Sequence, residues 1–415
     1  MAYIKVENLK YRYPNTKKLA LDDLNFEIEK GSFIGIAGAN GAGKSTLCQA
    51  FNGLVPGFFK GAYGGRVIID GEETAKVPVS RLCQKVGLVF QNPFNQLSGA
   101  KETVFEEIAF GLQNFGVPAD EMIKRVNEVM ELLDIAEYKR RNPFDLSGGQ
   151  MQRVALAGIL AMKPDVIVLD EPTSQLDPAG SEEVFAAVDK LAKSGITIIM
   201  VEQKLEKLAE YCDKILLLHE GHQIAFDTPD KIFSREDLKS CGVNPPAYTR
   251  ICQTFGIRKA NGCYPASLKD TLAQKDQFPQ EEIFGKACTE EIEELDQRVS
   301  GKEVFRMEHL NFEYLENTPV LKDLNLLLDG RSTAVIGQNG AGKTTILKSM
   351  IRQMKPLCGI VYLDEKKTDE MQRNELARKL SVVLTDRVRT ERMTCRDVVS
   401  TGRYPYTGKF GVLSE

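Results

Sequence analysis

Two glycine-rich segments of this 415-residue chain have the spacing of a phosphate-binding loop, G-x-x-x-x-G-K-[ST]. The first, GANGAGKS, ends in Lys44 and Ser45, and the second, GQNGAGKT, ends in Lys343 and Thr344. In such a loop the glycines let backbone N–H groups surround phosphate oxygens, and the next helix adds its positive N-terminal end. The lysine would reach the β- and γ-phosphates, and the hydroxyl would ligate Mg²⁺. Both segments therefore predict a nucleoside triphosphate site.

The flanks of the first loop have the strand–loop–helix order that this pattern needs. Residues 32–37 (SFIGIA) are typical of a buried strand, and residues 46–52 have helical character without Gly or Pro. The residues that we expect to contact nucleotide in the two loops are Asn40, Gly41, Gly43, Lys44, Ser45, Thr46, Asn339, Gly340, Gly342, Lys343, Thr344 and Thr345.

A pair of carboxylates, Asp170 and Glu171, follows a second buried-strand pattern at 165–169 (DVIVL). The carboxyl ends of parallel strands face the ligand crevice of an α/β sheet. Asp170 therefore suits the coordination shell of Mg²⁺, and Glu171 suits orienting or deprotonating an attacking water.

A third segment, LSGGQ at 146–150, leads into a helical run at 151–162. A Ser-Gly-Gly turn before a helix offers a hydroxyl, exposed N–H groups and the helix dipole. The sequence predicts a second anion-binding site there, formed by Ser147, Gly148, Gly149 and Gln150.

Other patterns have plainer explanations. Tyr13 ends a strand pattern ahead of the first loop, where its ring could stack on adenine or be a half-buried strand residue. In the helical pattern at 119–135, Met122, Val126, Val129 and Leu133 recur on one face, and core packing is their expected role.

Composition narrows the function classes. The formal net charge of −4 gives no indication of nucleic-acid binding. No window approaches 18 apolar residues, so we expect no membrane span, and any membrane role must involve partner subunits. The nine cysteines include no C-x-x-C pair, which favours reduced cytosolic thiols over disulfides or zinc ligands.

The chain is predicted to have three regions. Residues 1–235 hold every motif above except the second phosphate loop, and residues 236–302 form an acidic linker or accessory segment. From residue 303 the first pattern restarts, with Tyr314 matching Tyr13, so 303–415 is an internal repeat of the N-terminal part.

The motifs occur in the order found in ATP-binding cassette (ABC) ATPases, which the chain resembles over 3–233 and partly over 303–415. The matching elements are Tyr13, GANGAGKS, Gln91, LSGGQ, VIVLDEP, SQLD and the strand before Gln203. The resemblance implies an α/β fold: a P-loop NTPase cassette of ABC type, with a mixed-sheet core, an antiparallel β subdomain and a helical subdomain, in repeated form.

The resemblance also assigns roles to residues. Tyr13 and Tyr314 become adenine-stacking residues, and residues 147–150 close over ATP that a different cassette holds. Gln91 senses Mg²⁺ and the attacking water. The implied catalytic residues are Glu171, Gln91 and Gln203, and the implied metal ligands are Ser45, Gln91, Asp170 and Thr344.

Within the family, the first half is similar to energy-coupling-factor ATPases, which drive vitamin and cobalt/nickel uptake. The resemblance implies an ATP-hydrolysing importer subunit, with ATP and Mg²⁺ as ligands, at the cytoplasmic face of the cell membrane. Its partners would be transmembrane subunits and another cassette, a second copy or a paralogue.

Two other functions stay open, and a third is disfavoured. The tail from 380 is more similar to iron-siderophore importer ATPases, so a siderophore or cobalamin importer is one alternative. A nucleotide-gated protein without a transport role is another. A twin cassette acting on ribosomes or DNA is disfavoured by the acidic linker and the net negative charge.

Two departures from the family pattern matter. Gln203 stands where the family has a histidine, and a glutamine can donate a hydrogen bond but cannot carry a proton charge. In addition, Asp170 follows Lys44 by 126 positions, whereas 72 positions follow Lys343, so the repeat contains no LSGGQ and no carboxylate pair. We therefore expect the second cassette to be a fragment or vestigial.

Overall fold

The computed structural model describes residues 2–174, 176–279, 303–314, 319–338, 340–383 and 393–407. The chain divides into two compact units, Met1–Glu281 and Glu282–Glu415. The hydrophobic residues of the second unit form a core of their own, separate from those of the first.

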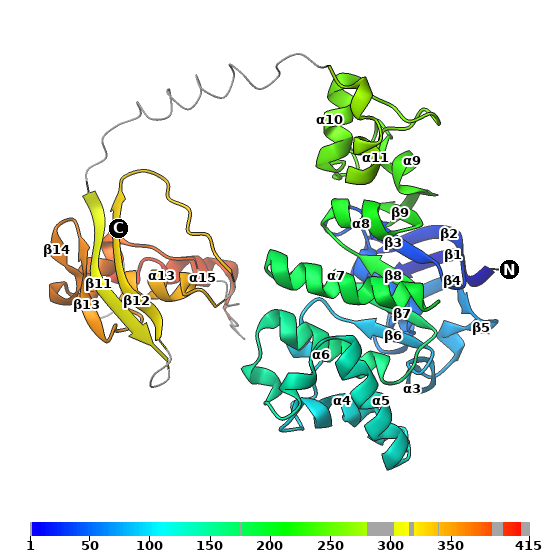
Figure 1. Cartoon of the computed structure of the whole chain (residues 1–415), viewed down its shortest axis with the longest axis horizontal. Helices are drawn as coiled ribbons and strands as arrows, with labels where there is room; N and C mark the ends of the chain where they lie inside the picture. Colours follow the sequence, from blue (N-terminus) through cyan, green and yellow to red (C-terminus); the bar gives the residue numbers. More distant parts are fainter. Residues whose placement is uncertain are drawn as a thin grey trace. The chain divides into compact units, whose positions relative to one another are not determined.

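The first unit contains both strands and helices (Figure 1). Its strands are β1 (Ala2–Arg12), β2 (Leu21–Glu29), β3 (Phe33–Ala37), β4 (Ala62–Ile69), β5 (Glu72–Glu73), β6 (Val86–Val89), β7 (Val166–Asp170), β8 (Thr197–Val201), β9 (Lys214–His219) and β10 (His222–Asp227). Its helices are α1 (Lys44–Phe51), α2 (Leu54–Gly57), α3 (Val79–Leu82), α4 (Val104–Asn114), α5 (Ala119–Leu132), α6 (Gly148–Leu160), α7 (Pro178–Lys193), α8 (Leu205–Tyr211), α9 (Pro229–Phe233), α10 (Ala247–Phe255) and α11 (Leu268–Leu272).

Strand β3 lies inside a six-stranded sheet of order β10-β9-β3-β8-β7-β6. It pairs in parallel with β8 and β9, and all five of its residues are buried. Only β10 runs antiparallel to its neighbour, so the sheet is mixed, as the resemblance to ABC ATPases implies. A continuous apolar run suits this position because both faces of the strand are covered.

The two faces of β3 contact different cores. Ile34 and Ile36 pack with α1 and with the antiparallel sheet β2-β1-β4-β5, whereas Phe33 and Ala37 pack with helices α4 to α7. The N-terminus of α1 is thereby fixed at the carboxyl end of β3.

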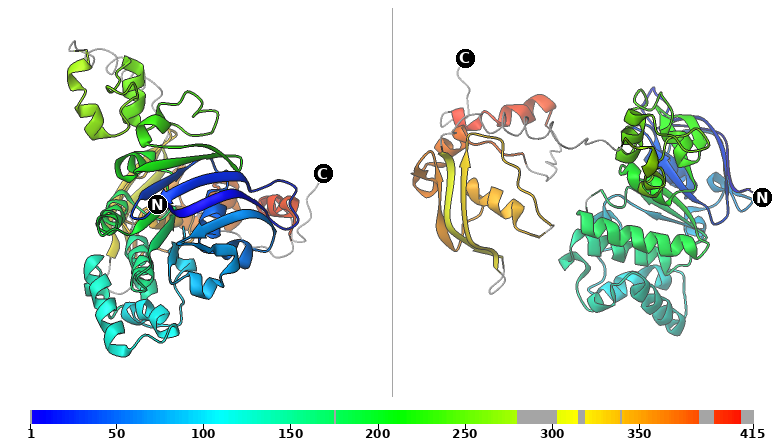
Figure 2. Two further views of the ribbon diagram at one scale, coloured as in Figure 1. Left: turned by 90° about the vertical axis from the view of Figure 1, so that its right-hand side faces the viewer. Right: turned by 45° about the horizontal axis from the view of Figure 1, so that its top comes forward.

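Helices α4, α5 and α6 group at one end of the first unit, and α10 and α11 lie at the other end (Figures 1 and 2). On α5, Val126 and Val129 are buried, as is Leu133 just beyond it, and Met122 packs against the same core. The core-packing role expected for this stripe is confirmed.

Residues 236–279 are folded. Helices α10 and α11 bury Thr249 and Cys252, and Thr249 Oγ1 donates a hydrogen bond to the carbonyl of Pro265 at 2.8 Å. The acidic stretch at 281–298 lies outside the described residues.

The second unit has an antiparallel sheet of order β12-β11-β13-β14. Its strands are β11 (Glu303–Glu313), β12 (Pro319–Asp329), β13 (Cys358–Leu363) and β14 (Lys366–Lys367), and its helices are α13 (Lys343–Met350), α14 (Arg373–Lys379) and α15 (Cys395–Thr401). This sheet repeats the strand order β2-β1-β4-β5 of the first unit.

The second unit differs from the first just before its phosphate loop. Residues 332–338, which correspond to β3 and the start of the loop, form no strand and are exposed. In neither unit does any described helix have the length and apolar character needed to cross a membrane.

Candidate nucleotide site

The first phosphate loop is shaped by glycines that no larger residue could replace. Gly43, directly before α1, has φ +99°, and a Cβ atom there would lie 2.4 Å from the carbonyl oxygen of Ala20. At Gly38 (φ +154°) a Cβ atom would lie 2.3 Å from the carbonyl oxygen of Leu218. Such distances exclude any side chain, so the loop is held against β9 and the start of β2.

Lys44 opens α1 and is 7% exposed. Its Nζ donates hydrogen bonds to the carbonyls of Gly38 at 2.9 Å and Ala39 at 3.0 Å. Burial lowers the pKa of Lys44, and the nearby carboxylates of Glu171 and Asp170 work against this shift. The ammonium group is thus held over the loop, close to two carboxylates.

Asp170 ends β7, which places it at the carboxyl edge of the sheet. Burial raises its pKa, and a hydrogen bond with the side chain of Ser45 opposes the rise. Its Oδ1 is buried and has no hydrogen-bond partner among the described residues. A buried acceptor of this kind beside a hydroxyl fits a hard cation such as Mg²⁺, which takes oxygen ligands.

Glu171 is 7% exposed and is held by two amides. The Nε2 atoms of Gln91 and Gln203 each donate a hydrogen bond to its Oε2, both at 2.9 Å. The three residues come from the ends of three different strands, β6, β7 and β8. The structure therefore brings together all three residues that were expected to be catalytic.

A cavity of about 480 Å³ joins these groups. It is lined by Tyr13, Ala20, Asn40, Gly41, Gly43, Lys44, Ser45, Thr46, Gln91, Glu171 and Gln203. Tyr13 is hydrogen-bonded through its hydroxyl to Thr46 Oγ1 at 3.1 Å, and its ring packs edge-on against Tyr11. Tyr13 is thus both a half-buried packing residue and part of the cavity wall.

Residues 147–150 do not line this cavity. Ser147 caps α6, accepting a hydrogen bond from the N–H of Gln150, while Gln150 Oε1 accepts one from the N–H of Ser147. This capping box orders the turn and satisfies the N–H groups of Ser147 and Gln150 within it. The predicted second anion site stays a prediction, and the residues expected to form it lie apart from the cavity that Lys44 lines.

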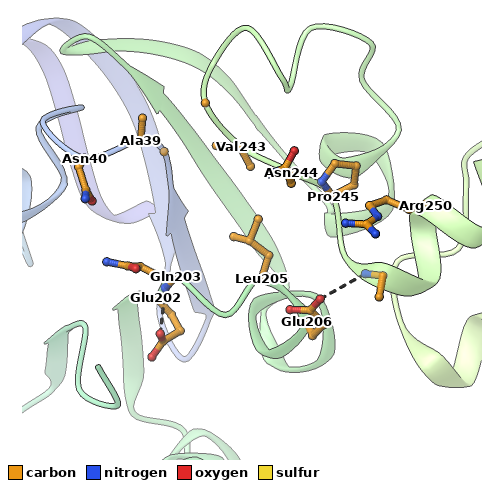
Figure 3. A pocket seen from close by; sticks show the side chains of 13 residues that line it. Ala39, Asn40, Glu202, Gln203, Leu205, Glu206, Val243, Asn244, Pro245 and Arg250 are labelled. Carbon is orange, nitrogen blue, oxygen red and sulfur yellow. Dashed lines mark hydrogen bonds between the residues drawn. The ribbon is translucent and has the colours of Figure 1, made fainter. Parts of the chain in front are cut away.

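A second cavity, of about 470 Å³, adjoins the outer side of the phosphate loop (Figure 3). Gly38, Ala39 and Asn40 line it together with Glu202, Gln203 and residues of the 242–250 segment. Glu206 Oε1 accepts a hydrogen bond from the N–H of Ala247 at 3.2 Å, which ties the start of α10 to α8.

The second phosphate loop has the same internal geometry as the first. Lys343 Nζ donates to the carbonyls of Gly337 at 2.7 Å and Gln338 at 2.6 Å, and Tyr314 is hydrogen-bonded to Thr345 Oγ1 at 3.1 Å. Gly340 and Gly342 have positive φ, like their counterparts, and Thr344 is exposed. Asn339 lies outside the described residues.

The sequence patterns did not single out Thr173 and Glu202. Both are buried and hydrogen-bonded to each other, and both lie within two residues of Glu171 or Gln203. A polar residue directly after an apolar strand was the available signal, but it cannot show which way the side chain points.

A buried parallel strand, a glycine loop, a helix, and carboxylates at the end of a parallel strand of the same sheet, with β8 between the two strands, together define a P-loop NTPase. The antiparallel sheet and the helical group beside this core give the first unit the fold of an ABC ATPase cassette.

Comparison with known proteins agrees with this assignment of the fold. The family model described as ABC transporter matches residues 21–174 and 321–409. A putative ABC transporter ATP-binding protein of Methanosarcina mazei is 36% identical over 388 residues, which cover 91% of this chain and 65% of that protein. The chain belongs to the ABC transporter family, as an ATP-binding cassette protein.

Two further relatives match mainly the first unit. The energy-coupling factor transporter ATP-binding protein EcfA1 of Streptococcus sanguinis is 40% identical over 66% of this chain and 96% of its own length. The structure of cbiO1 from Clostridium perfringens, described as part of the ABC transporter complex cbiONQ, has a TM-score of 0.51 and 36% identity, covering 57% of this chain and 92% of that one.

The chain is shorter than some of its relatives. It spans 65% of the Methanosarcina mazei protein and 60% of a similarly named protein of Methanosarcina acetivorans.

Proposed function

We propose that this chain binds and hydrolyses ATP to drive an importer of the energy-coupling-factor type, which takes up a vitamin or cobalt/nickel. Its partners are transmembrane subunits, and it works at the cytoplasmic face of the cell membrane. The similarity to EcfA1 and cbiO1 supports this transporter class. The observation that carries hydrolysis is the meeting of Lys44 and Glu171 in one cavity.

The proposal assigns a role to each group in that cavity. Lys44 binds the β- and γ-phosphates, and the amides of the loop hold the phosphate oxygens. Glu171 orients the attacking water and accepts its proton, while Gln91 and Gln203 fix the carboxylate through Oε2.

Mg²⁺ is the cofactor that this site suits. Ser45 and Asp170 would hold it, with Gln91 beside them, and in the second loop Thr344 is the matching hydroxyl. When bound, the ion neutralises phosphate charge. The buried, unpartnered Oδ1 of Asp170 supports this assignment.

The site around Lys44 needs a second cassette. Residues 147–150, the expected second anion site, do not line the cavity of the same unit, so an ATP molecule in that cavity would meet this turn only from another cassette. We infer that the first cassette, 1–235, pairs with another copy or a paralogue. The accessory segment 236–302 and the second cassette 303–415 complete the proposed division of the chain.

The test is ATP turnover by the full chain over a range of protein concentrations, with Glu171→Gln as the variant. Removing the base should lower turnover by about 10²- to 10⁴-fold and leave ATP binding intact. Specific activity should rise with concentration if two chains share the site.

A matched control for this test is Glu29→Gln, the same chemical change at an exposed residue that ends β2. It should leave turnover unchanged. Wild-type turnover no higher than that of Glu171→Gln would contradict hydrolysis, and concentration-independent specific activity would contradict pairing.

A second candidate function is a nucleotide-gated switch that does not hydrolyse ATP. Gln203 favours it, because an amide cannot take up the proton charge that a histidine could. In that case wild type and Glu171→Gln would bind ATP equally and both would lack turnover. The siderophore or cobalamin importer remains an alternative for the cargo, and uptake assays with the membrane subunits would distinguish the two.

A further inference from the structure

The loop after β8 is fixed by a buried carboxylate. Glu202 is 3% exposed, and its Oε2 accepts a hydrogen bond from Thr173 Oγ1 at 2.7 Å. Its Oε1 accepts hydrogen bonds from the backbone N–H groups of Gln203 at 2.9 Å and Lys204 at 3.3 Å. One side chain thus joins the loop after β7 to the main chain of the loop after β8.

A second tie lies on the other side of Gln203. Lys204 Nζ donates a hydrogen bond to Ser181 Oγ at 2.6 Å, and Ser181 is buried in the first turn of α7. Gln203 is therefore flanked by two residues that are both attached to the segment following Glu171. Its backbone has little freedom, and its side chain takes a defined direction.

The side chain of Gln203 points toward Glu171 in the candidate nucleotide site. Gln203 Nε2 lies 2.9 Å from Oε2 of Glu171, whereas the Glu202 side chain points away from the Asn40 side of the cavity (Figure 3). A shift of the loop by an ångström would break the amide–carboxylate hydrogen bond, because such bonds weaken steeply with distance and angle.

We propose that Glu202 is a positioning residue, which uses Thr173 as its anchor to hold the amide of Gln203 on Glu171. We call Thr173, Glu202 and Gln203 the carboxylate bracket. It rests on the proposed function, since its effect is on hydrolysis. A charged side chain at position 203 could stay beside Glu171 by electrostatic attraction. Gln203 has no charge, and the bracket holds its amide beside Glu171 instead.

The first variant is Thr173→Val, which keeps the shape of the side chain and removes the hydroxyl donor. In the full chain we expect kcat to fall about tenfold while KM for ATP changes less than about twofold, since positioning errors of this size act on the chemical step. Thr173→Ser keeps the donor and should retain most of the turnover.

A double-mutant cycle separates positioning from a general loss of packing. If the bracket acts through Gln203, Thr173→Val should cause no further loss in a Gln203→Ala background. Additive losses would overturn the proposal, as would a Thr173→Val chain with wild-type kcat.

The matched control is Thr197→Val at the opposite end of β8. Thr197 is also buried, and its hydroxyl accepts a hydrogen bond from the N–H of Gly31 at 2.9 Å. Both variants should lower the melting temperature by a similar amount, but only Thr173→Val should lower kcat. Equal effects of the two on kcat would overturn the proposal.

Amide hydrogen exchange gives a result that does not depend on turnover. The backbone N–H groups of Gln203 and Lys204 donate hydrogen bonds to Glu202. Thr173→Val should speed hydrogen exchange at these two groups, and Thr197→Val should not. If the wild-type chain does not hydrolyse ATP, the proposed function fails, and the exchange rates still decide whether the bracket exists. Unchanged exchange would overturn it.

Discussion

The two phosphate loops of this chain have the same internal hydrogen bonds, but the segments that precede them differ. In both, the lysine donates hydrogen bonds to the carbonyls of the first two loop residues, and a tyrosine is bonded to a threonine of the next helix at 3.1 Å. The strand before the loop differs. All residues of β3 are buried between β8 and β9, whereas Ile336 is 90% exposed.

This difference shows which parts of the site form from residues near in the chain and which need residues distant in the chain. The loop and the first turn of the helix depend on glycines with positive φ and on hydrogen bonds from the lysine to carbonyls five and six residues earlier, so they form in both units. A central parallel strand needs neighbours on both edges and cover on both faces. Among the described residues of the second unit, 332–338 have neither, and no carboxylate pair faces Lys343.

The largest expected difference between the two units comes from replacing the loop lysine of each with alanine. Lys44→Ala should lower ATP turnover by at least about 10²-fold, because it removes the cation beside the proposed catalytic carboxylate. Lys343→Ala should change turnover by less than about threefold, since no carboxylate pair faces Lys343 among the described residues of its unit. Steady-state phosphate release from the full chain measures both. Equal losses would show that the two loops contribute equally and would break the comparison.

A smaller effect is expected from trimming the strand before each loop. Ile36→Ala should destabilise the first unit by about 2–5 kcal/mol, because it leaves a cavity between β3 and α1. Val335, the counterpart of Ile36, is 40% exposed, so Val335→Ala should cost less than about 0.5 kcal/mol. Hydrogen exchange, analysed separately for peptides of each unit, reports both. A large cost at Val335 would mean that residues 332–338 are covered in solution.

The smallest effect concerns helix caps. Ser147 and Thr394 both form capping boxes, at the starts of α6 and α15. Ser147→Ala should cost about 1 kcal/mol, since α6 buries most of its residues and the cap is coupled to the core. Helix α15 buries none of its residues, so Thr394→Ala should only fray it locally. Urea unfolding should therefore detect the first change and not the second.

Much of the site could be predicted from sequence because its motifs are local. The glycine spacing of 38–45, the strand before Asp170 and the capping turn at Ser147 each form from residues that are near in the chain. The meeting of Gln91, Glu171 and Gln203 could be expected only through the family pattern, because they follow three separate strands.

Other features required the structure. The role of Glu202 depends on the direction in which a side chain leaves the end of β8, and alternation along a five-residue strand does not fix that direction once the chain turns. The sequence left open whether 236–279 is a linker or a folded accessory segment, because its helices are short and bury small or polar residues such as Thr249.

The sequence by itself determined the two loops, the Ser-Gly-Gly turn before a helix and the family, because the motifs that identify them consist of residues close together in the chain. Only the tertiary structure decided that residues 332–338 form no buried strand before the second loop and that the Glu202 side chain reaches Thr173. Those outcomes depend on the order of strands in a sheet, and a strand acquires its place only when its neighbours are present on both sides.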